Sequence, residues 1–484
     1  MSDSNENNTA KTNATPSLLE PESRGGDTAE GGFSFQDGVI VATIPQWLAH
    51  EGFTSFIREA IGDVESRWFE PALGEIIDAI EAKNHHITPV PFWHEVERFQ
   101  QMALSSDYRH FTLACTSTSE EIKAISEAMR RVRDPRSFYS GDSDVLENST
   151  KDFVASIENK GKTKSDAEFL LSRVQISDGW TSSKDFAEGM FRQAAERWIP
   201  GFSDLPGNRV GRVFDRLLTL VRQRLNQPIT RKDLESAICV VLEDDNFFAD
   251  HRIRVETTTA TFTGSERALR LDWNDFFGSD GRAYPLAADW ESTVVEQLTA
   301  TRKWIVENRN QRRLVLGGER RLSTSVAIGT QFPAVSGFNI DMEHRGQKWS
   351  TDSHAKPGDA YDISESHSGE NGNELVIVID IIRDISTAVK TACPDFGLAD
   401  SAFSHFHGRD AITSDRQANA IVQSIKQSIE RRLHETGAKR IHLFLACPSH
   451  LALFLGHRLN ATAEIQCYEW SNATNYVPTC ALRT

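Results

Sequence analysis

Apolar residues recur along residues 31–150 with the spacings typical of alternating helices and strands. A mainly apolar segment from Gly31 to about His50 predicts a helix, and polar and apolar positions begin to alternate at Asp63. The expected strands are 63–69, 75–83 and 110–116, separated by turn residues at 70–74, and the further helices are 92–104 and a segment from Ser119. We expect residues 84–91 to leave the sheet, so that 31–150 forms one compact α/β unit.

The segments on either side of this unit have simpler patterns. Residues 1–30 are polar with almost no apolar content, which predicts a disordered leader, because such a chain cannot bury enough surface to offset its ordering entropy. Residues 151–245 carry apolar positions at helical spacing, for example in 213–225, and show no strand pattern. They predict a helical connector that acts as a spacer or a dimer surface.

The remaining region, 246–484, alternates short apolar runs with helical patterns. The expected strands are 312–317, 374–380, 440–446 and 463–470, and the expected helices lie near 288–308, 322–330, 414–436 and 449–459. Buried strands separated by helices predict a doubly wound parallel sheet. A strand that starts at Arg313, with a helix ending at Gly329, recurs 127 residues later as a strand from Arg440 with a helix ending at Gly456. This internal repeat leaves open two Rossmann-like units in tandem or one larger sheet.

The length and charge of the chain narrow the classes of function. At roughly 150 residues per domain, 484 residues predict two to four domains. Lys and Arg number 53 against 69 Asp and Glu, a net charge of −16, which argues against a protein that binds nucleic acid constitutively. Residues 24–150 alone hold 11 basic and 21 acidic side chains, so any DNA binding must be local or conditional. The basic cluster at 130–133, with Arg136, is either a solvated helix face or a phosphate contact.

Other features of the composition favour a cytoplasmic protein. The apolar run 375–379 is interrupted by Asp380 and is far shorter than the roughly 20 residues of a membrane helix, and no secretory signal is recognised. The six cysteines form no C-x-x-C pair and are expected to be reduced thiols. His405 and His407 form a close pair, as do two histidines at 85–86. Either pair could ligate a metal, but a structural role is favoured, because strand neighbours point to opposite faces and no cysteine lies nearby.

Acidic and basic side chains on two expected strands suit metal-dependent phosphodiester hydrolysis. Glu81 and Lys83 are two residues apart and therefore share a face, as Asp63 and Glu65 are expected to do on the preceding strand. Carboxylate oxygens hold Mg²⁺ or Mn²⁺ beside a phosphate, and a lysine positions or deprotonates the attacking water and screens charge. The expected metal ligands are Asp63, Glu65 and Glu81. The expected catalytic residues are Glu65, Glu81 and Lys83, and a surface ion pair is the alternative for the last two.

This arrangement resembles the PD-(D/E)xK motif of restriction-endonuclease-like nucleases, with Glu81 and Lys83 as its E-x-K pair. The helix opening at 32–36, Gly-Phe-Ser-Phe-Gln, is similar to that of the nuclease domain fused to signalling receptors in bacterial defence systems, and this resemblance adds Gln36 to the catalytic residues. No proline precedes the upstream acid. That ligand therefore stays open between Asp63, Glu65 and Asp78.

Loops at the carboxyl ends of the C-terminal strands are the expected ligand-binding site, because helix N-termini and arginines there favour phosphates. The candidates after the three main strands are Arg320, Arg321 and Ser323; Arg383, Asp384 and Ser386; and Pro448 and Ser449. Trp349, Tyr468 and Trp470 are candidates for stacking on a base. The alternatives are that the serines cap helices and that the tryptophans belong to the core.

The run 441–458, with 465–470 and 476–478, resembles a SAVED domain, the sensor of bacterial cyclic-oligonucleotide-based antiphage signalling (CBASS), and 271–273 and 316–323 fit the same pattern. The resemblance implies two tandem CARF-like halves that bind a cyclic oligonucleotide, commonly a cyclic trinucleotide such as cyclic tri-AMP. It covers about 250–484.

The whole chain resembles the nuclease–SAVED effectors of CBASS. This implies a Mg²⁺-dependent endodeoxyribonuclease for double-stranded DNA that self-associates when it binds a messenger made by a separate cyclic-nucleotide synthase. The alternatives are a non-enzymatic receptor or scaffold and an enzyme that degrades the cyclic nucleotide.

Overall fold

The computed structural model describes residues 30–105, 107–139, 143–259, 267–278, 281–344, 346–354, 356, 359, 361–369, 372–459, 463–472 and 475–483. The chain divides into two compact units, one of residues 1–69 and 75–248 and the other of residues 70–74 and 249–484. The leader expected at residues 1–30 lies, apart from Glu30, outside the described residues. Each unit is described by itself below.

The N-terminal unit is built on a six-stranded sheet with the strand order β5-β4-β3-β2-β1-β6. Its strands are β1 (Phe53–Arg58), β2 (Val64–Glu70), β3 (Gly74–Ile87), β4 (Tyr108–Thr118), β5 (Val174–Ser177) and β6 (Ile229–Thr230). The neighbours β3, β4 and β5 run parallel, whereas β1 is antiparallel to both β2 and β6. The long strand β3 therefore lies in the interior of the sheet.

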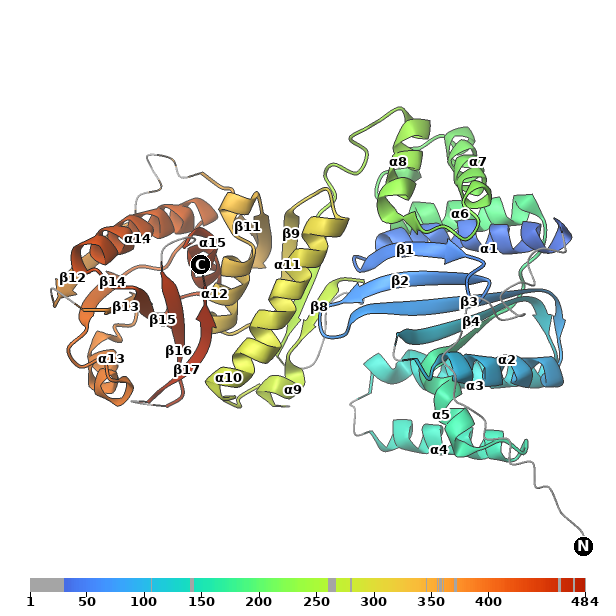
Figure 1. Cartoon of the computed structure of the whole chain (residues 1–484), viewed down its shortest axis with the longest axis horizontal. Coiled ribbons are helices and arrows are strands. Elements are labelled where there is room, and N and C mark those ends of the chain that lie inside the picture. The colour runs from blue at the N-terminus through green and yellow to red at the C-terminus, as the bar shows by residue number, and fades with distance from the viewer. Residues whose placement is uncertain are drawn as a thin grey trace, which may run out of the picture. The chain divides into compact units, whose positions relative to one another are not determined.

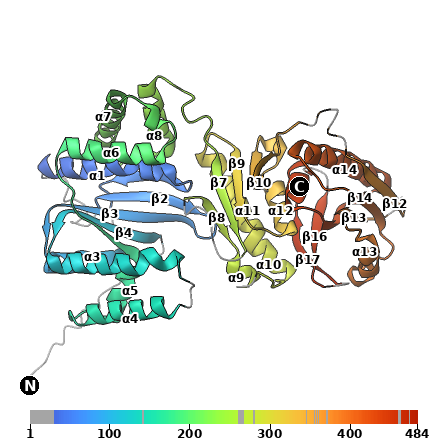
Figure 2. The same cartoon turned by 180° about the vertical axis from the view of Figure 1, so that it is seen from behind.

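Helices cover both faces of this sheet, so the unit has three layers (Figure 1, Figure 2). One face is covered by α1 (Glu30–Ala49), α6 (Lys184–Trp198), α7 (Gly207–Gln223) and α8 (Arg231–Leu242), which share a buried apolar cluster with β1 and β2. The other face is covered by α2 (Pro89–Met102), α3 (Glu120–Arg133), α4 (Asp144–Glu158) and α5 (Lys164–Arg173), which share a second cluster with β4. These two clusters form the core.

The expected helices and strands of 31–150 are confirmed, but two predictions from the pattern are wrong. Residues 84–87 do not leave the sheet, because Ile87 is buried and pairs with Thr118 at the far end of β4. The segment 151–245 is not free of strands, because it supplies β5 and β6 at the two edges of the same sheet. These strands have four and two residues, which is too short for an alternating pattern to be detected.

The C-terminal unit contains two separate sheets with mainly parallel strands. The first has the order β11-β10-β9-β7-β8 and the second the order β12-β14-β13-β15-β16-β17. The first sheet comprises β7 (Ile253–Thr258), β8 (Leu269–Asp272), β9 (Arg313–Gly318), β10 (Asn339–His344) and β11 (Gln347–Ser350). The second comprises β12 (Ile363–Ser368), β13 (Glu374–Ile381), β14 (Ala402–Gly408), β15 (Arg440–Ala446), β16 (Glu464–Trp470) and β17 (Tyr476–Leu482). Two Rossmann-like sheets, rather than one larger sheet, confirm the expected fold class.

The helices of this unit include both members of the internal repeat, α12 and α15. They are α9 (Asn274–Phe277), α10 (Ala287–Trp290), which continues through a π-helical turn (Glu291–Val295) into α11 (Glu296–Asn308), α12 (Leu322–Gln331), α13 (Ser386–Ala392), α14 (Asp415–Thr436) and α15 (Ser449–Arg458). A Cβ atom on Gly329 would lie 2.2 Å from the Leu453 carbonyl oxygen, and one on Gly456 would lie 2.3 Å from that of Val326. The repeated glycines therefore allow α12 and α15 to touch backbone to backbone.

Among the helices of the described residues, none combines the length and apolar content needed to cross a membrane.

Candidate functional site

The central strand β3 places Glu81 and Lys83 on one face of the N-terminal sheet, as their spacing predicts. The Lys83 Nζ atom lies 2.7 Å from Glu81 Oε1 and 3.0 Å from Oε1 of Glu95, which belongs to α2. Arg98, one helical turn after Glu95, pairs with the second Glu81 oxygen and lies with its Nε atom 3.0 Å from Glu95 Oε2. Two carboxylates and two cations thus hold one another in place, and Glu81 is buried among them.

Asp63 completes this cluster from the turn before β2. Its Oδ2 atom accepts a hydrogen bond of 2.6 Å from the backbone N–H of Ala82, next to Glu81. Burial, together with the charge of Glu81, raises the pKa of Asp63 to about 8. Gln36 of α1 is buried and donates from Nε2 to the backbone carbonyl of Asp63 at 3.2 Å. The structure thus brings four of the expected residues together.

A further carboxylate, Glu59, reaches the same region. Burial raises its pKa, a hydrogen bond from the Gln36 side chain opposes that shift, and the charge of Glu81 adds to it. The charge of Glu81 disfavours the charged forms of Asp63 and Glu59, and a bound cation would stabilise them. The donor set therefore fits a hard divalent ion such as Mg²⁺ or Mn²⁺, with Asp63 and Glu81 as its oxygen donors.

Glu65 does not join this cluster. Its Oε1 atom accepts hydrogen bonds from the backbone N–H groups of Ile61 (3.0 Å) and Gly62 (3.3 Å) and from the Tyr108 hydroxyl (3.0 Å). The expectation that Asp63 and Glu65 share a strand face is wrong, because β2 begins only at Val64 and Asp63 lies in the preceding turn. Glu65 instead fixes the turn from which Asp63 projects.

Asp78 and Arg133, candidates for the metal ligand and the phosphate contact, instead form structural contacts elsewhere in the N-terminal unit. Asp78 accepts hydrogen bonds from Arg109 at 2.8 and 3.1 Å, so its carboxylate is held by that guanidinium. Within the basic cluster of α3, Arg133 donates to the backbone carbonyls of Leu171 and Val174, each at 2.7 Å, and so fastens α3 to α5 and β5. Arg130, Arg131 and Arg136 are exposed.

Sequence reasoning missed Glu59, Glu95 and Arg98. The last two carried a signal, since a Glu and an Arg three residues apart lie on one face of the helix expected at 92–104. Glu59 carried none, because it lies in a turn.

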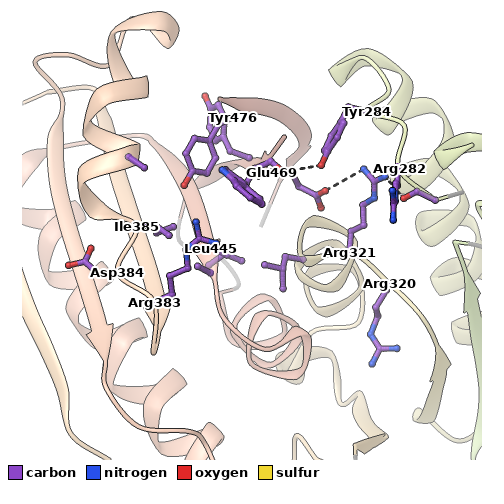
Figure 3. Close-up of a pocket in the computed structure, with 16 residues that line it drawn as sticks. Arg282, Tyr284, Arg320, Arg321, Arg383, Asp384, Ile385, Leu445, Glu469 and Tyr476 are labelled. Carbon is purple, nitrogen blue, oxygen red and sulfur yellow. Dashed lines mark hydrogen bonds and ion pairs between the residues drawn. The ribbon is translucent and has the colours of Figure 1, made fainter. Parts of the chain in front are cut away.

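The C-terminal unit contains a pocket of about 470 Å³ at the carboxyl ends of β9, β13, β15 and β16 (Figure 3). Its charged lining residues are four arginines and two carboxylates: Arg282, Arg320, Arg321, Arg383, Asp384 and Glu469. Its aromatic lining residues are Tyr284, Tyr468, Trp470 and Tyr476. Cations and aromatic rings together suit a ligand that carries phosphates and bases.

Contacts with neighbouring residues of the protein hold the Arg321 guanidinium in place. Its Nη2 atom donates to the carbonyls of Gly281 and Ala283, each at 2.7 Å, and its Nη1 atom lies 3.5 Å from Oε2 of Glu469, toward which it points in Figure 3. Its guanidinium also lies over the rings of Phe277 and Tyr284, with the centroids at 4.2 and 4.9 Å. Burial raises the pKa of Glu469, and Arg321 opposes that shift. Arg321 therefore shapes this wall of the pocket.

Arg383 is more accessible. Its side chain is exposed, and its guanidinium lies 5.1 Å from the ring centroid of Trp470, which is 46% exposed. Among the described residues no carboxylate forms an ion pair with Arg383. Arg320 points away from Arg321 and Glu469 in Figure 3 and donates to the Gly318 carbonyl at 3.1 Å. Arg383 is thus an exposed cation of the pocket lining that can meet a phosphate.

Five of the expected ligand-binding residues do not line the pocket: Ser323, Trp349, Ser386, Pro448 and Ser449. The N–H of Ser323, at the start of α12, donates to Glu469 Oε1 at 3.1 Å, so a carboxylate of the chain itself occupies this helix N-terminus. Trp349 is buried and its ring lies 4.2 Å from that of His450, as expected of a core residue. The N–H of Ser386 donates to Asp384 Oδ1 at 2.8 Å at the start of α13.

Pro448 and Ser449 form the start of α15 and are partly buried. The lining residue Tyr284 was not anticipated; its hydroxyl donates to the Trp470 carbonyl at 2.9 Å. Tyr284 lies in a segment between the expected helices and strands, where the sequence has no hydrophobic periodicity from which its position could be predicted.

Comparison with known proteins places this chain among sensors fused to effectors. The profile of the SAVED family, the "SMODS-associated and fused to various effectors sensor domain", matches residues 297–482. CD-NTase-associated protein 4 of Moraxella osloensis is 30% identical over 476 residues, which cover 96% of this chain and 99% of that protein. The protein of the same name from an Acinetobacter species is 29% identical over 478 residues, with the same coverage.

Solved structures agree over nearly the whole chain. The Acinetobacter baumannii Cap4 SAVED/CARF-domain containing receptor with the cyclic trinucleotide 3'3'3'-cAAA is similar with a TM-score of 0.81 at 26% identity, covering 94% of this chain and all of that one. The Moraxella osloensis Cap4 SAVED/CARF-domain containing receptor is similar with a TM-score of 0.77 at 27% identity, covering 94% of this chain and all of that one. These findings confirm the resemblance to CBASS effectors. The chain belongs to the CD-NTase-associated protein 4 (Cap4) family, with a SAVED domain in its C-terminal unit.

Proposed function

We propose that this protein is a cyclic-trinucleotide-activated, metal-dependent endodeoxyribonuclease that cuts double-stranded DNA in antiphage defence. The observation that carries the proposal is the group formed by the buried Glu81 with the half-buried Asp63 and Lys83, in a chain whose solved relative holds 3'3'3'-cAAA. A pair of carboxylates can hold the metal ion of phosphodiester hydrolysis, and an adjacent protonated lysine can stabilise the negative charge of the transition state.

The ligand of the C-terminal pocket is proposed to be a cyclic trinucleotide that contains adenine. A second solved receptor from Acinetobacter baumannii, with the cyclic trinucleotide 2'3'3'-cAAA, has a TM-score of 0.81 to this chain at 25% identity, covering 95% of this chain and all of that one. The exposed guanidinium of Arg383 offers paired donors to a phosphate, and Trp470 and Tyr284 offer rings to the bases. Four arginines against two carboxylates make the lining cationic within an acidic chain.

In the N-terminal unit, Asp63 and Glu81 would hold the divalent cation, which when bound polarises the scissile phosphate and lowers the pKa of a water molecule. Burial lowers the pKa of Lys83, but the charges of Glu81 and Glu95 outweigh it and raise the pKa above its ordinary value. Lys83 therefore stays protonated at neutral pH. Its role is to stabilise the negative charge of the phosphorane-like transition state and to hold Glu81, not to remove a proton from water.

The remaining residues of the site position these groups. Gln36 holds the backbone at Asp63, and Glu95 with Arg98 fixes the rotamers of Glu81 and Lys83. Because the chain carries a net charge of −16, a single copy has low affinity for DNA, and we propose that ligand-driven self-association supplies enough contacts for binding. The messenger would come from a separate cyclic-nucleotide synthase.

The proposal is tested by incubating plasmid with Mg²⁺ and a panel of cyclic oligonucleotides, with the parent chain and with Lys83→Ala. We expect the parent chain to cut the plasmid only when a cyclic trinucleotide is present. In Lys83→Ala the cleavage rate should be at least about 100-fold lower. Lys123→Ala on α3 is the matched control and should cut at the parental rate. Cleavage by Lys83→Ala at the parental rate would refute the assigned site. Recovery of a cleaved nucleotide with intact plasmid would instead identify an enzyme that degrades the messenger, and binding without cleavage of either would identify a receptor.

A further inference from the structure

Outside both sites, Asp380, His405 and His407 meet near the carboxyl ends of two neighbouring strands, β13 and β14. His405 Nε2 lies 2.8 Å from Asp380 Oδ2, and His407 Nδ1 lies 2.5 Å from Asp380 Oδ1. One ligand atom of each residue lies within 4.8 Å of the others, and among the described residues this is the cluster of three or more side chains whose geometry could hold a metal ion. All three residues belong to the C-terminal unit.

The prediction that His405 and His407 point to opposite faces of their strand is wrong. His405 and His407 are two residues apart on β14, so they point to the same face of the sheet. Asp380 lies directly opposite His407 in the parallel pairing of β13 with β14. The two strands therefore hold the three side chains in a fixed arrangement, on rigid elements rather than on loops.

The negative charge of the buried Asp380 carboxylate would be stabilised by a cation. Asp380 is fully buried, and its ion-pair partners within the described part of the chain are these two imidazoles, without a lysine or an arginine. A buried carboxylate is normally paired with a full positive charge or with a metal. His405 and His407 retain 11% and 19% exposure of their side chains, so an ion can reach the cluster from solvent.

We propose that Asp380, His405 and His407 form a binding site for a divalent transition-metal ion of the zinc type. Two imidazole nitrogens and one carboxylate oxygen are a common set of three protein ligands for such an ion. The Asp384 carboxylate lies with Oδ1 3.9 Å from the same nitrogen of His405, so it can provide a fourth oxygen directly or through a water molecule. Mg²⁺ prefers a shell of oxygens, which separates this site from the one at Asp63 and Glu81.

The competing arrangement is a hydrogen-bonded network without metal. Asp380 can accept from both imidazole N–H groups and from the backbone N–H of Ile385, which lies 3.0 Å from its Oδ2 atom. In that arrangement each ring carries a proton on the nitrogen that faces Asp380. A metal requires those same nitrogens to be unprotonated, so the two arrangements exclude each other and metal binding distinguishes them.

The site has a structural consequence for the pocket. The same Ile385 N–H joins Asp380 to the loop that carries Arg383 and Asp384, which with Ile385 line the pocket and are labelled in Figure 3. A metal on Asp380 would hold this loop, and hence Arg383, in position before the ligand arrives. This coupling, unlike the metal site itself, rests on the proposed nucleotide receptor.

The test uses the full-length chain without a histidine tag. Zinc content is measured after dialysis against Zn²⁺, and Co²⁺ titration is followed by visible absorption, both in the absence of nucleotide. We expect one tightly bound ion per chain, with an intense tetrahedral-type Co²⁺ spectrum, and an affinity at least about 10-fold lower in His407→Ala. His367→Ala removes a neighbouring histidine that contacts Glu365, and Glu81→Gln alters the other metal site; both should keep the ion.

No Zn²⁺ or Co²⁺ bound by the folded parent chain at micromolar concentrations would overturn the proposal, as would full retention in a folded double variant lacking both His405 and His407. If that variant does not fold, the Co²⁺ spectrum of the parent decides alone. Titration of 3'3'3'-cAAA with and without a chelator then tests the coupling: equal affinity refutes it. Absence of nucleotide binding would refute the proposed receptor and leave the metal result standing.

Discussion

Replacing Arg383 with alanine is expected to weaken binding of a cyclic trinucleotide without changing the stability of the fold. Arg383 is exposed, and the contact that the structure gives it is the face of Trp470 at 5.1 Å. A charge-assisted hydrogen bond is worth about 1.5–3 kcal/mol, which corresponds to a loss of affinity of about 10- to 150-fold. The free energy of unfolding should change by less than about 0.5 kcal/mol, as is usual for a surface substitution.

The matched comparison is Arg321→Ala at the opposite wall of the same pocket. Removing this guanidinium leaves Glu469, whose side chain is 11% exposed, buried without its cation. Breaking a buried ion pair in this way costs about 3–5 kcal/mol. The variant should therefore lose stability first and affinity only as a result. Lys390→Ala is the charge-matched control, because Lys390 lies on α13 over the ring of Phe403 and does not line the pocket.

The assay is isothermal titration with 3'3'3'-cAAA at one fixed salt concentration, paired with urea unfolding of each variant. Parental affinity in Arg383→Ala would show that this side chain does not meet a phosphate. An equal loss of stability in the Arg383 and Arg321 variants would refute the distinction between an accessible arginine and a structural one.

Three further predictions concern other parts of the chain. Gly329→Ala should lower the free energy of unfolding by about 1–3 kcal/mol, seen as a lower urea midpoint, because its Cβ would lie 2.2 Å from a backbone oxygen, whereas Gly189→Ala, with open space at its Cβ, should not destabilise. Burial lowers the pKa of His457 to about 4, below its unfolded value, so the unfolded chain binds more protons between pH 4 and 6.5 and stability falls as the pH falls through that window. His457→Asn should remove about 2 kcal/mol of the loss between pH 7 and 5, and equal losses in parent and variant would contradict the assignment. Glu65→Ala should reduce DNA cleavage about 10- to 100-fold and Glu65→Gln should largely restore it, because Gln keeps the acceptor for the turn; complete loss in both variants would make Glu65 a metal ligand after all.

Local patterns in the sequence determined the features that depend on spacing alone. Short runs of apolar residues are enough to place β13 and β15, and mixed apolar and polar positions are enough to place β3. Within a strand, side-chain direction repeats every two residues. The same rule predicts that Glu81 and Lys83 meet, as the distance of 2.7 Å confirms. The internal repeat, in which each copy is a continuous strand and helix, left two tandem units and one larger sheet both open, and the two separate sheets of the structure decided between them.

Tertiary structure alone decided which distant residues meet, since that depends on strand register and on the ends of loops. Asp63 rather than Glu65 faces Glu81, because the chain turns just before β2 and the period of two does not apply there. Glu469 accepts a hydrogen bond from the N–H of Ser323 at the N-terminus of α12, from 146 residues away. Asp380 reaches the two histidines only through the register of β13 with β14. No spacing within either segment encodes such contacts, because the free energy that selects them comes from packing the whole sheet.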